Sequence, residues 1–245
     1  MKPFVRHFIA PIARRRRWRR VCEIGASTGK CTDEMLQRIP ELSYTIIDPC
    51  FDEDLAAKYA GDRRVTVHKA NSLQVLPTLD DRFDAILIDG DHNWFTVYNE
   101  LVQIHERGLL AAGGMVFFHD VQWPYARRDC YYQPETIPDQ FRHPYERKGI
   151  VRGKSELVDG GGFNAKYNNA IREGGPKNGV LTAIEDFVTE HRAEYTFHRV
   201  RIQFGLGILH RRTGHRADDV AFGMVGLKAA LYSAVGRLRP AAGAG

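Results

Sequence analysis

Acidic and histidine side chains follow two short apolar stretches of this chain, and their spacing suggests one shared site. The first stretch ends in Asp89, Asp91 and His92, and the second ends in His119 and Asp120. Both stretches have the continuous apolar, β-prone character of strands that are buried on both faces. In open α/β sheets, ligands bind beyond the carboxyl ends of the strands. Neighbouring strands lie about 4.8 Å apart, so Asp89 and Asp120 can bind the same cation.

These residue types suit a metal ion and a proton transfer. Carboxylates are the ligands that a hard cation such as Mg²⁺ prefers, and a histidine three residues after Asp89 suits a general base. The competing interpretations are structural: His92 as the cap of the following helical turn, and Asp89 as a helix N-cap. Asp91 is either that cap or a partner of the ligands. His119 either binds the metal or forms a hydrogen bond with Asp120, and the residues alone favour neither.

A glycine-flanked turn at residues 25–29 follows the first predicted strand and precedes a helix. Its glycines let a ligand approach the backbone, and the helix N-terminus offers unpaired N–H groups. The turn lacks the GxGxxG spacing of a pyrophosphate-binding turn, which argues against NAD or FAD. Asp48, at the end of the second predicted strand, is placed to bind ribose hydroxyls. Asn71 and Ser72, after the third, are placed to contact an adenine.

Strands alternate with helices along most of the chain, which predicts an α/β fold with a Rossmann-like, doubly wound and mostly parallel sheet. Strands are predicted at residues 20–24, 42–47, 65–68, 85–88 and 115–118, and an antiparallel C-terminal hairpin at 195–202 and 205–211. Helices are predicted at residues 1–19, 32–39, 53–59, 93–107, 179–190 and 221–238. The first helix is expected to pack on the sheet edge. The whole chain, 1–245, is predicted to form a single domain.

Residues 121–178 interrupt this pattern with prolines and glycines, and we call this segment the insertion. A loop region this long inside a compact domain usually forms a lid or a substrate wall, and its aromatic content argues against disorder. Its candidate stacking residues are Trp123, Tyr125, Tyr131, Tyr132, Tyr145 and Tyr167, and its candidate anion-binding residues are Arg127, Arg128 and Arg147. The competing interpretation is that several of these aromatic residues only pack the insertion onto the sheet. His143 is a further candidate base.

Composition excludes few classes of protein. A hydrophobic content of 43% and a charged content of 27% are ordinary for a soluble globular protein. The longest apolar run, residues 109–118, is too short and glycine-rich to span a bilayer. The four cysteines show no CxxC pairing, which favours reduced thiols in a cytoplasmic protein. An arginine-rich run at residues 14–20 suits either an anionic partner or a solvated face.

Taken together, these motifs resemble the class I S-adenosylmethionine-dependent methyltransferases. The resemblance rests on ExGxxxG at residues 23–29, an acid after the second strand and an acid after the fourth. IDGDH at 88–92 followed by GGxxxxHD at 113–120 is similar to the metal-dependent small-molecule O-methyltransferases. The branch with macrocin O-methyltransferase and the cephalosporin hydroxylase-like proteins is the most similar. The resemblance covers residues 20–120 well and the helix at 178–190 loosely.

The resemblance implies a cofactor, a metal and an acceptor. Residues implied to bind S-adenosylmethionine are Glu23, Gly25, Ala26, Ser27, Gly29, Asp48, Asn71, Ser72 and Asp89. Mg²⁺, or another divalent cation, is implied at Asp89 and Asp120 with His119 as the candidate third ligand, although relatives often have an acid at that position. His92 is the implied general base. The implied acceptor is a hydroxyl of a sugar or glycosylated small molecule, including a saccharide of polysaccharide assembly.

Two other functions stay open. The arginine-rich run and a pI near 9.0 suit an RNA or other nucleic-acid methyltransferase, but IDGD stands where base N-methyltransferases usually carry an NPPY-like motif. A non-catalytic chain that keeps the fold within a biosynthetic complex is the third interpretation, and the intact acidic set argues against it. The sequence leaves open whether the chain forms a homo-oligomer.

Overall fold

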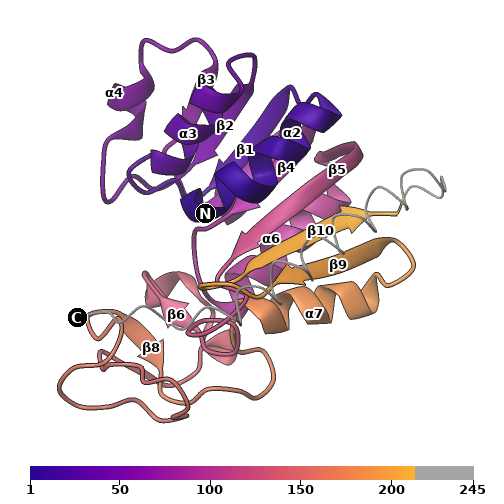
Figure 1. Ribbon diagram of the computed structural model, residues 1–245. Coiled ribbons are helices and arrows are strands. Elements are labelled where there is room, and N and C mark those ends of the chain that lie inside the picture. The colour runs from indigo at the N-terminus through magenta and orange to yellow at the C-terminus, as the bar shows by residue number, and fades with distance from the viewer. Residues whose placement is uncertain (213–245) are drawn as a thin grey trace.

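The computed structural model describes residues 1–212 of the protein, so the helix predicted at 221–238 lies outside the described residues. Its main sheet has seven strands in the order β3-β2-β1-β4-β5-β10-β9 (Figure 1). The first five strands are parallel, and β10 runs antiparallel to both β5 and β9. The strands are β1 (Arg20–Ile24), β2 (Ser43–Ile47), β3 (Val65–His68), β4 (Phe83–Ile88), β5 (Leu110–His119), β9 (Tyr195–Val200) and β10 (Leu206–Arg211). The predicted Rossmann-like sheet with its antiparallel hairpin is confirmed.

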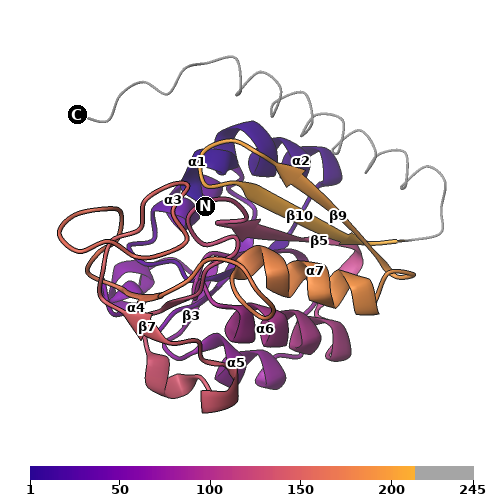
Figure 2. The same ribbon diagram turned by 90° about the horizontal axis from the view of Figure 1, so that it is seen from below.

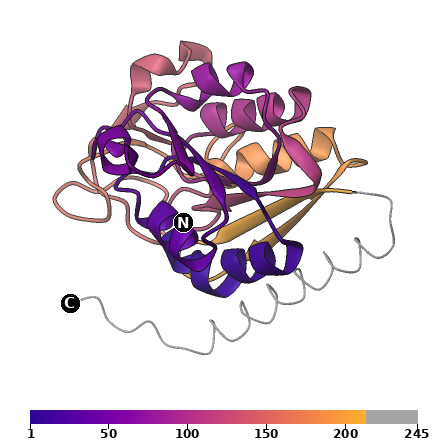
Figure 3. The same cartoon turned by 90° about the horizontal axis from the view of Figure 1, so that it is seen from above.

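Helices cover both faces of this sheet (Figures 2 and 3). One face is covered by α1 (Lys2–Phe4), the π-helical turn η1 (Val5–Ile9), α2 (Ala10–Arg16), α3 (Lys30–Arg38) and α4 (Leu55–Tyr59). The other is covered by α5 (Ser72–Val75), the 3₁₀ turn η2 (Leu76–Thr78), α6 (Trp94–Glu106) and α7 (Val180–Glu190). None of the helices within residues 1–212 is long and apolar enough to cross a membrane.

The double coverage explains why the central strands are apolar without alternation. In β4, Ala85 and Leu87 face one helical layer, while Ile86 and Ile88 face the other. The N-terminal helices lie in the first layer, where Phe4 and Phe8 join the core formed by the sheet. The prediction that residues 1–19 pack on the sheet edge is therefore wrong. Their apolar side chains cover the face of the central strands, which would otherwise be exposed to water.

The insertion has its own small sheet in the order β6-β8-β7. Its strands are β6 (Cys130–Tyr131), β7 (Tyr145–Glu146) and β8 (Asn168–Ala170), and two 3₁₀ turns, η3 (Pro134–Thr136) and η4 (Asp139–Phe141), lie between β6 and β7. Buried Asp129 anchors this segment by accepting two backbone hydrogen bonds. One comes from the N–H of Trp94, the first residue of α6, and the other from the N–H of Gly179, just before α7. The insertion is thereby held beyond the carboxyl ends of the central strands (Figure 1).

Candidate functional site

The chain order of the sheet reverses between β1 and β4, and this is the point where open α/β sheets bind ligands. Asp89 leaves the end of β4, and its N–H donates to the carbonyl oxygen of Ile24 at the end of β1. Gly25, with φ +81°, packs its backbone directly against Gly90. A Cβ at Gly25 would lie 2.2 Å from the Cα atom of Gly90, so only glycine allows the turn and the end of β4 to meet this closely.

Four side chains meet at this point, and we call Asp89, His92, His119 and Asp120 the Asp–His cluster. Nδ1 of His119 lies 3.1 Å from Oδ1 of Asp89 and 3.0 Å from Oδ2 of Asp120. Nε2 of His92 lies 2.5 Å from the same Asp120 oxygen and 3.8 Å from Oδ1 of Asp89. One ligand atom from each residue fits within 4.8 Å of the others. The ammonium group of Met1 also donates to Asp89.

Burial and mutual attraction set the charges of this cluster. Burial would raise the pKa of Asp89 and of Asp120. The neighbouring histidines, and for Asp89 also the Met1 ammonium, outweigh it and hold both pKa values below the ordinary value. Burial would lower the pKa of His92, yet Asp120 raises it overall. Burial would also lower the pKa of His119, but Asp89 and Asp120 outweigh it and raise the pKa to about 9. The two histidines and the Met1 ammonium therefore hold both carboxylates in the ionised form.

The start of α6 excludes the interpretation of Asp89, Asp91 or His92 as its cap. Asn93 is the N-cap, because its side chain accepts a hydrogen bond of 2.8 Å from the N–H of Thr96. Asp89, Asp91 and His92 therefore do not cap this helix. His92 precedes the cap. Asp91 instead accepts a hydrogen bond from the hydroxyl of Thr96.

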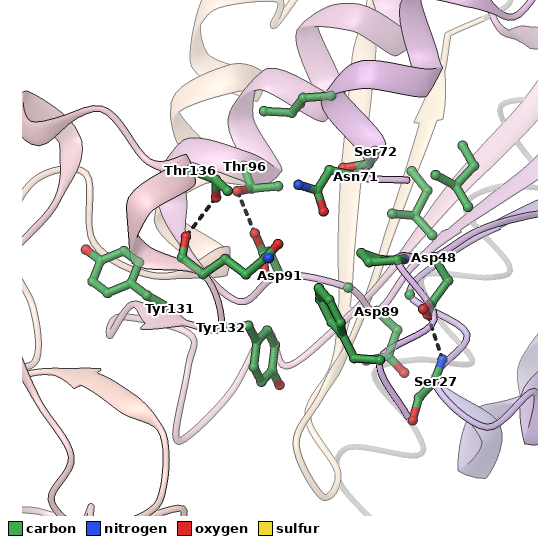
Figure 4. Close-up of a pocket in the computed structure, with 18 of the residues that line it drawn as sticks. Ser27, Asp48, Asn71, Ser72, Asp89, Asp91, Thr96, Tyr131, Tyr132 and Thr136 are labelled. Atoms are coloured by element: carbon green, nitrogen blue, oxygen red, sulfur yellow. Dashed lines mark hydrogen bonds between the residues drawn. The ribbon is translucent and has the colours of Figure 1, made fainter. Parts of the chain in front are cut away.

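A cavity of about 860 Å³ extends from this point between the sheet and the insertion (Figure 4). It is lined by six of the predicted cofactor residues: Gly25, Ser27, Asp48, Asn71, Ser72 and Asp89. Asp48 accepts hydrogen bonds from the N–H groups of Ser27, at 2.8 Å, and Cys50, at 2.6 Å. Its carboxylate thus holds the turn of residues 25–29 beside the end of β2.

The other three predicted cofactor residues lie elsewhere. Ala26 and Glu23 line a second, smaller cavity, and Glu23 is almost fully buried. The hydroxyls of Thr32 and Tyr44 donate to Glu23, so its carboxylate joins β1 to α3 and β2. Gly29 lines neither cavity; it precedes α3 as its N-cap with φ +74°.

Sequence reasoning missed Glu100, which also lines the large cavity. It is fully buried, and Ser72 donates a 2.5 Å hydrogen bond to its Oε1. Its Oε2 has no hydrogen-bond partner within residues 1–212. Burial raises the pKa of Glu100 to about 8, so it is a neutral acid at neutral pH. An acid at a core-facing position of an otherwise apolar helical face was the available signal.

The smaller cavity, of about 330 Å³, lies directly on the Asp–His cluster. All four cluster residues line it, together with the aromatic residues Tyr125, Tyr132, Phe163 and Phe204. Tyr132 and Asp89 line both cavities, so the two spaces adjoin at these residues. The rings of Tyr125 and Tyr132 contact His92 edge-on, with centroids 5.3 and 5.9 Å away.

The predicted insertion residues divide between the cavities and the packing of the insertion. Tyr131, Tyr132, Tyr167 and Arg147 line the large cavity, as does Lys166, which sequence reasoning missed. Trp123 and Tyr145 line neither cavity. Arg127 pairs with Glu185, and buried Arg128 donates to the carbonyl oxygens of Ala170 and Ser155. The candidate base His143 is bonded to the carbonyl oxygen of Lys177 and also lines neither cavity.

Comparison with known proteins supports the fold. Residues 22–121 match the model of a family described as a methyltransferase domain. An SAH-bound methyltransferase from Podospora anserina is 15% identical, with a TM-score of 0.52 over 83% of this chain and 76% of that chain. A Streptomyces achromogenes O-methyltransferase involved in tomaymycin synthesis, solved with SAM, is 18% identical, with a TM-score of 0.51 over 83% and 77%. No curated protein matches the chain in sequence. The likeness to solved structures shows a methyltransferase fold.

Proposed function

We propose that this protein is an S-adenosylmethionine-dependent O-methyltransferase that uses a divalent metal ion. The observation that carries the proposal is the Asp–His cluster, which lies at the switch point of a methyltransferase fold and adjoins a cavity lined by Asp48, Asn71 and Ser72. Two structural neighbours hold SAM or SAH. The likeness of the IDGDH and HD motifs to the branch with macrocin O-methyltransferase supports metal-dependent O-methylation.

The large cavity suits the adenosine part of the cofactor. Asp48 offers a carboxylate for ribose hydroxyls, and Asn71 and Ser72 offer polar side chains beside the apolar residue Ile47 for an adenine. Bound S-adenosylmethionine would supply an electrophilic methyl group. Gly25 and Asp89, which line both cavities, mark the place where the cofactor and the acceptor would meet.

The donor set fits a divalent cation. Two ionised carboxylates and an imidazole offer ligand atoms within 4.8 Å of one another. A cation there would take the place that the Met1 ammonium now has beside Asp89. Mg²⁺ suits Asp89 and Asp120, whereas ligation by His119 would shift the preference toward Mn²⁺, Fe²⁺ or Zn²⁺. A metal ion there would bind the acceptor hydroxyl and lower its pKa.

His92 is the residue we propose as the general base. Its Nε2 is bonded to Asp120, which orients the imidazole, and its ring is held between Tyr125 and Tyr132. Its Nδ1 has no hydrogen-bond partner within the described residues. A positioned base that takes the hydroxyl proton contributes typically 10²–10⁴-fold to the rate, by general experience with enzymes.

The acceptor we propose is a sugar or a glycosylated small molecule. The support is the aromatic lining of the two cavities, because flat rings stack on the apolar faces of sugars and polar tips bind their hydroxyls. Arg147 and Lys166 add positive charge to the large cavity. These two residues favour an acceptor that carries a carboxylate or a phosphate, as many saccharide precursors do.

The position of the arginine-rich run argues against a nucleic-acid substrate. Arg19 precedes β1 and Arg20 begins it, and their backbone N–H groups donate to Asp84 near the start of β4. The run therefore lies at the amino ends of the strands, while the Asp–His cluster lies at the carboxyl ends. A polyanion bound to the run would be held away from the proposed reaction centre.

A donor-consumption assay against neutral and acidic sugars, with and without metal, tests the proposal. Turnover should stop in EDTA and return with Mg²⁺ or Mn²⁺, while S-adenosylmethionine binding measured by calorimetry survives. Arg147→Ala should reduce turnover of acidic sugars, and Arg127→Ala, which changes an arginine outside both cavities, is the matched control. Full activity in EDTA would exclude the metal, and turnover of RNA but of no sugar would favour the nucleic-acid alternative.

A further inference from the structure

A second group of metal-binding residue types lies at the other end of α6. His105 is in the last turn of α6, His191 is the C-cap residue of α7, and Glu194 lies just before β9. The two helices pack side by side on the same face of the sheet (Figure 2). Since α6 begins beside His92 and rises about 1.5 Å per residue, His105 lies roughly 17 Å farther along the helix axis. The group is thus separate from the Asp–His cluster.

We propose that His105, His191 and Glu194 form a zinc-class metal site that ties α6, α7 and the start of β9 together. Their ligand atoms lie within 4.8 Å of one another. Oε1 of Glu194 is 3.7 Å from Nδ1 of His191 and 3.9 Å from Nε2 of His105. With zinc–ligand distances of about 2.0–2.1 Å, neighbouring ligands of a tetrahedral ion lie about 3.3–3.4 Å apart. A movement of about half an ångström brings Oε1 of Glu194 to that spacing from each imidazole nitrogen.

Two neighbours orient the ligands in the way that metal sites require. Nδ1 of His105 is 3.1 Å from the hydroxyl of buried Tyr195, which leaves Nε2 directed toward Glu194. Arg211 donates at 2.8 Å to Oε2 of Glu194, which leaves Oε1 facing the two imidazoles. Hydrogen bonds of this kind to a ligating histidine or carboxylate fix its orientation and raise metal affinity.

The local electrostatics favour a cation at this place. His105 and His191 both lie at helix C-termini, where the unpaired carbonyl groups carry partial negative charge. Burial and the neighbouring His191 lower the pKa of His105, which favours the neutral imidazole that binds metals. Arg211 opposes a cation, but its charge is taken up by the oxygen of Glu194 that faces away from the imidazoles.

Two imidazoles and one carboxylate are a donor set for Zn²⁺ rather than Mg²⁺ or Ca²⁺, which prefer oxygen ligands. The three side chains are 22%, 24% and 37% exposed, so an ion can reach them from solvent. Because no methyl-transfer residue is involved, the role we assign to the ion is structural. It would add a link between the ends of two helices that are also joined by hydrogen bonds from Trp94 to Asp186 and from Tyr98 to Glu190.

Zinc stoichiometry of metal-stripped protein, measured by calorimetry and by elemental analysis after dialysis, tests this site. The wild type should bind one more zinc ion than His191→Ala or Glu194→Gln, and zinc should raise the melting temperature of the wild type more than that of either variant. His68→Ala, which removes a histidine outside both clusters, should match the wild type. Circular dichroism verifies that each variant is folded, and Glu194→Gln keeps the size of the side chain.

Tyr195→Phe separates a ligand-orienting hydrogen bond from simple packing. It should retain the stoichiometry but bind this zinc ion about 10- to 100-fold more weakly, the usual effect of losing such a partner. Equal zinc stoichiometry and equal zinc-dependent stabilisation in the wild type, His191→Ala and Glu194→Gln would overturn the proposal. Zinc binding here does not depend on methyl transfer, so the result is separate from the test of the proposed function.

Discussion

Replacing Glu100 with glutamine should stabilise the protein at neutral pH, and the gain should vanish in acid. Glu100 is fully buried in the wall of the large cavity, where only the hydroxyl of Ser72 binds its carboxyl group among the described residues. Burial is the main cause that raises the pKa of Glu100 from 4.5 to about 8, and nearby Asp91 adds to the rise. Glutamine has nearly the same shape and cannot ionise.

The magnitude follows from proton linkage. Between pH 4.5 and 8 the folded protein keeps the Glu100 proton and the unfolded chain does not, so stability is highest below pH 4.5 and falls as the pH rises toward 8. Each pH unit in this window costs about 1.36 kcal/mol. Glu100 alone therefore lowers the free energy of unfolding of the wild type by about 3 kcal/mol between pH 4.5 and pH 7. The Glu100→Gln variant lacks this loss.

Urea denaturation of the wild type and the variant at pH 5 and pH 7.5 measures the effect. Other titrating groups are common to both proteins, so the difference between their unfolding free energies isolates Glu100. Glu106→Gln changes an exposed glutamate at the end of the same helix and controls for the loss of a negative charge. A difference between wild type and Glu100→Gln that stays constant from pH 5 to pH 7.5 would show that Glu100 is not buried as described.

Three further predictions concern the proposed reaction. Asp48→Ala should weaken S-adenosylmethionine binding by about 1–3 kcal/mol, because the N–H groups of Ser27 and Cys50 lose their partner; unchanged affinity in calorimetry would remove Asp48 from the site. His92→Ala should lower turnover by roughly 10²–10⁴-fold while metal content stays the same, and an unaltered rate would exclude His92 as the base. Residues of the insertion that line the cavities should exchange amide hydrogens more slowly when acceptor is bound, and identical protection with and without acceptor would argue against a substrate wall.

Local patterns in the sequence were sufficient to predict the main sheet. Asp89 and Asp120 each follow an apolar run that belongs to a strand buried on both faces. Such runs are recognisable without knowing which strands lie beside them. The meeting of these acids was also predictable, because adjacent parallel strands end at the same edge of a sheet. The insertion was visible only as an interruption. Its strands are two or three residues long and carry no periodic signal.

Contacts between residues far apart in the chain were decided by the tertiary structure. The burial of Glu100 against Ser72 depends on how α6 packs on α5. Tyr132 reaches both cavities because Asp129 anchors the insertion to the starts of α6 and α7. His105 and His191 are brought together by the packing of α6 against α7. The apolar face of each helix indicates that the helix is buried, but it does not indicate which element it packs against. Periodicity determines which side of an element is buried, whereas its partner depends on shape and on polar contacts that a single sequence does not encode locally.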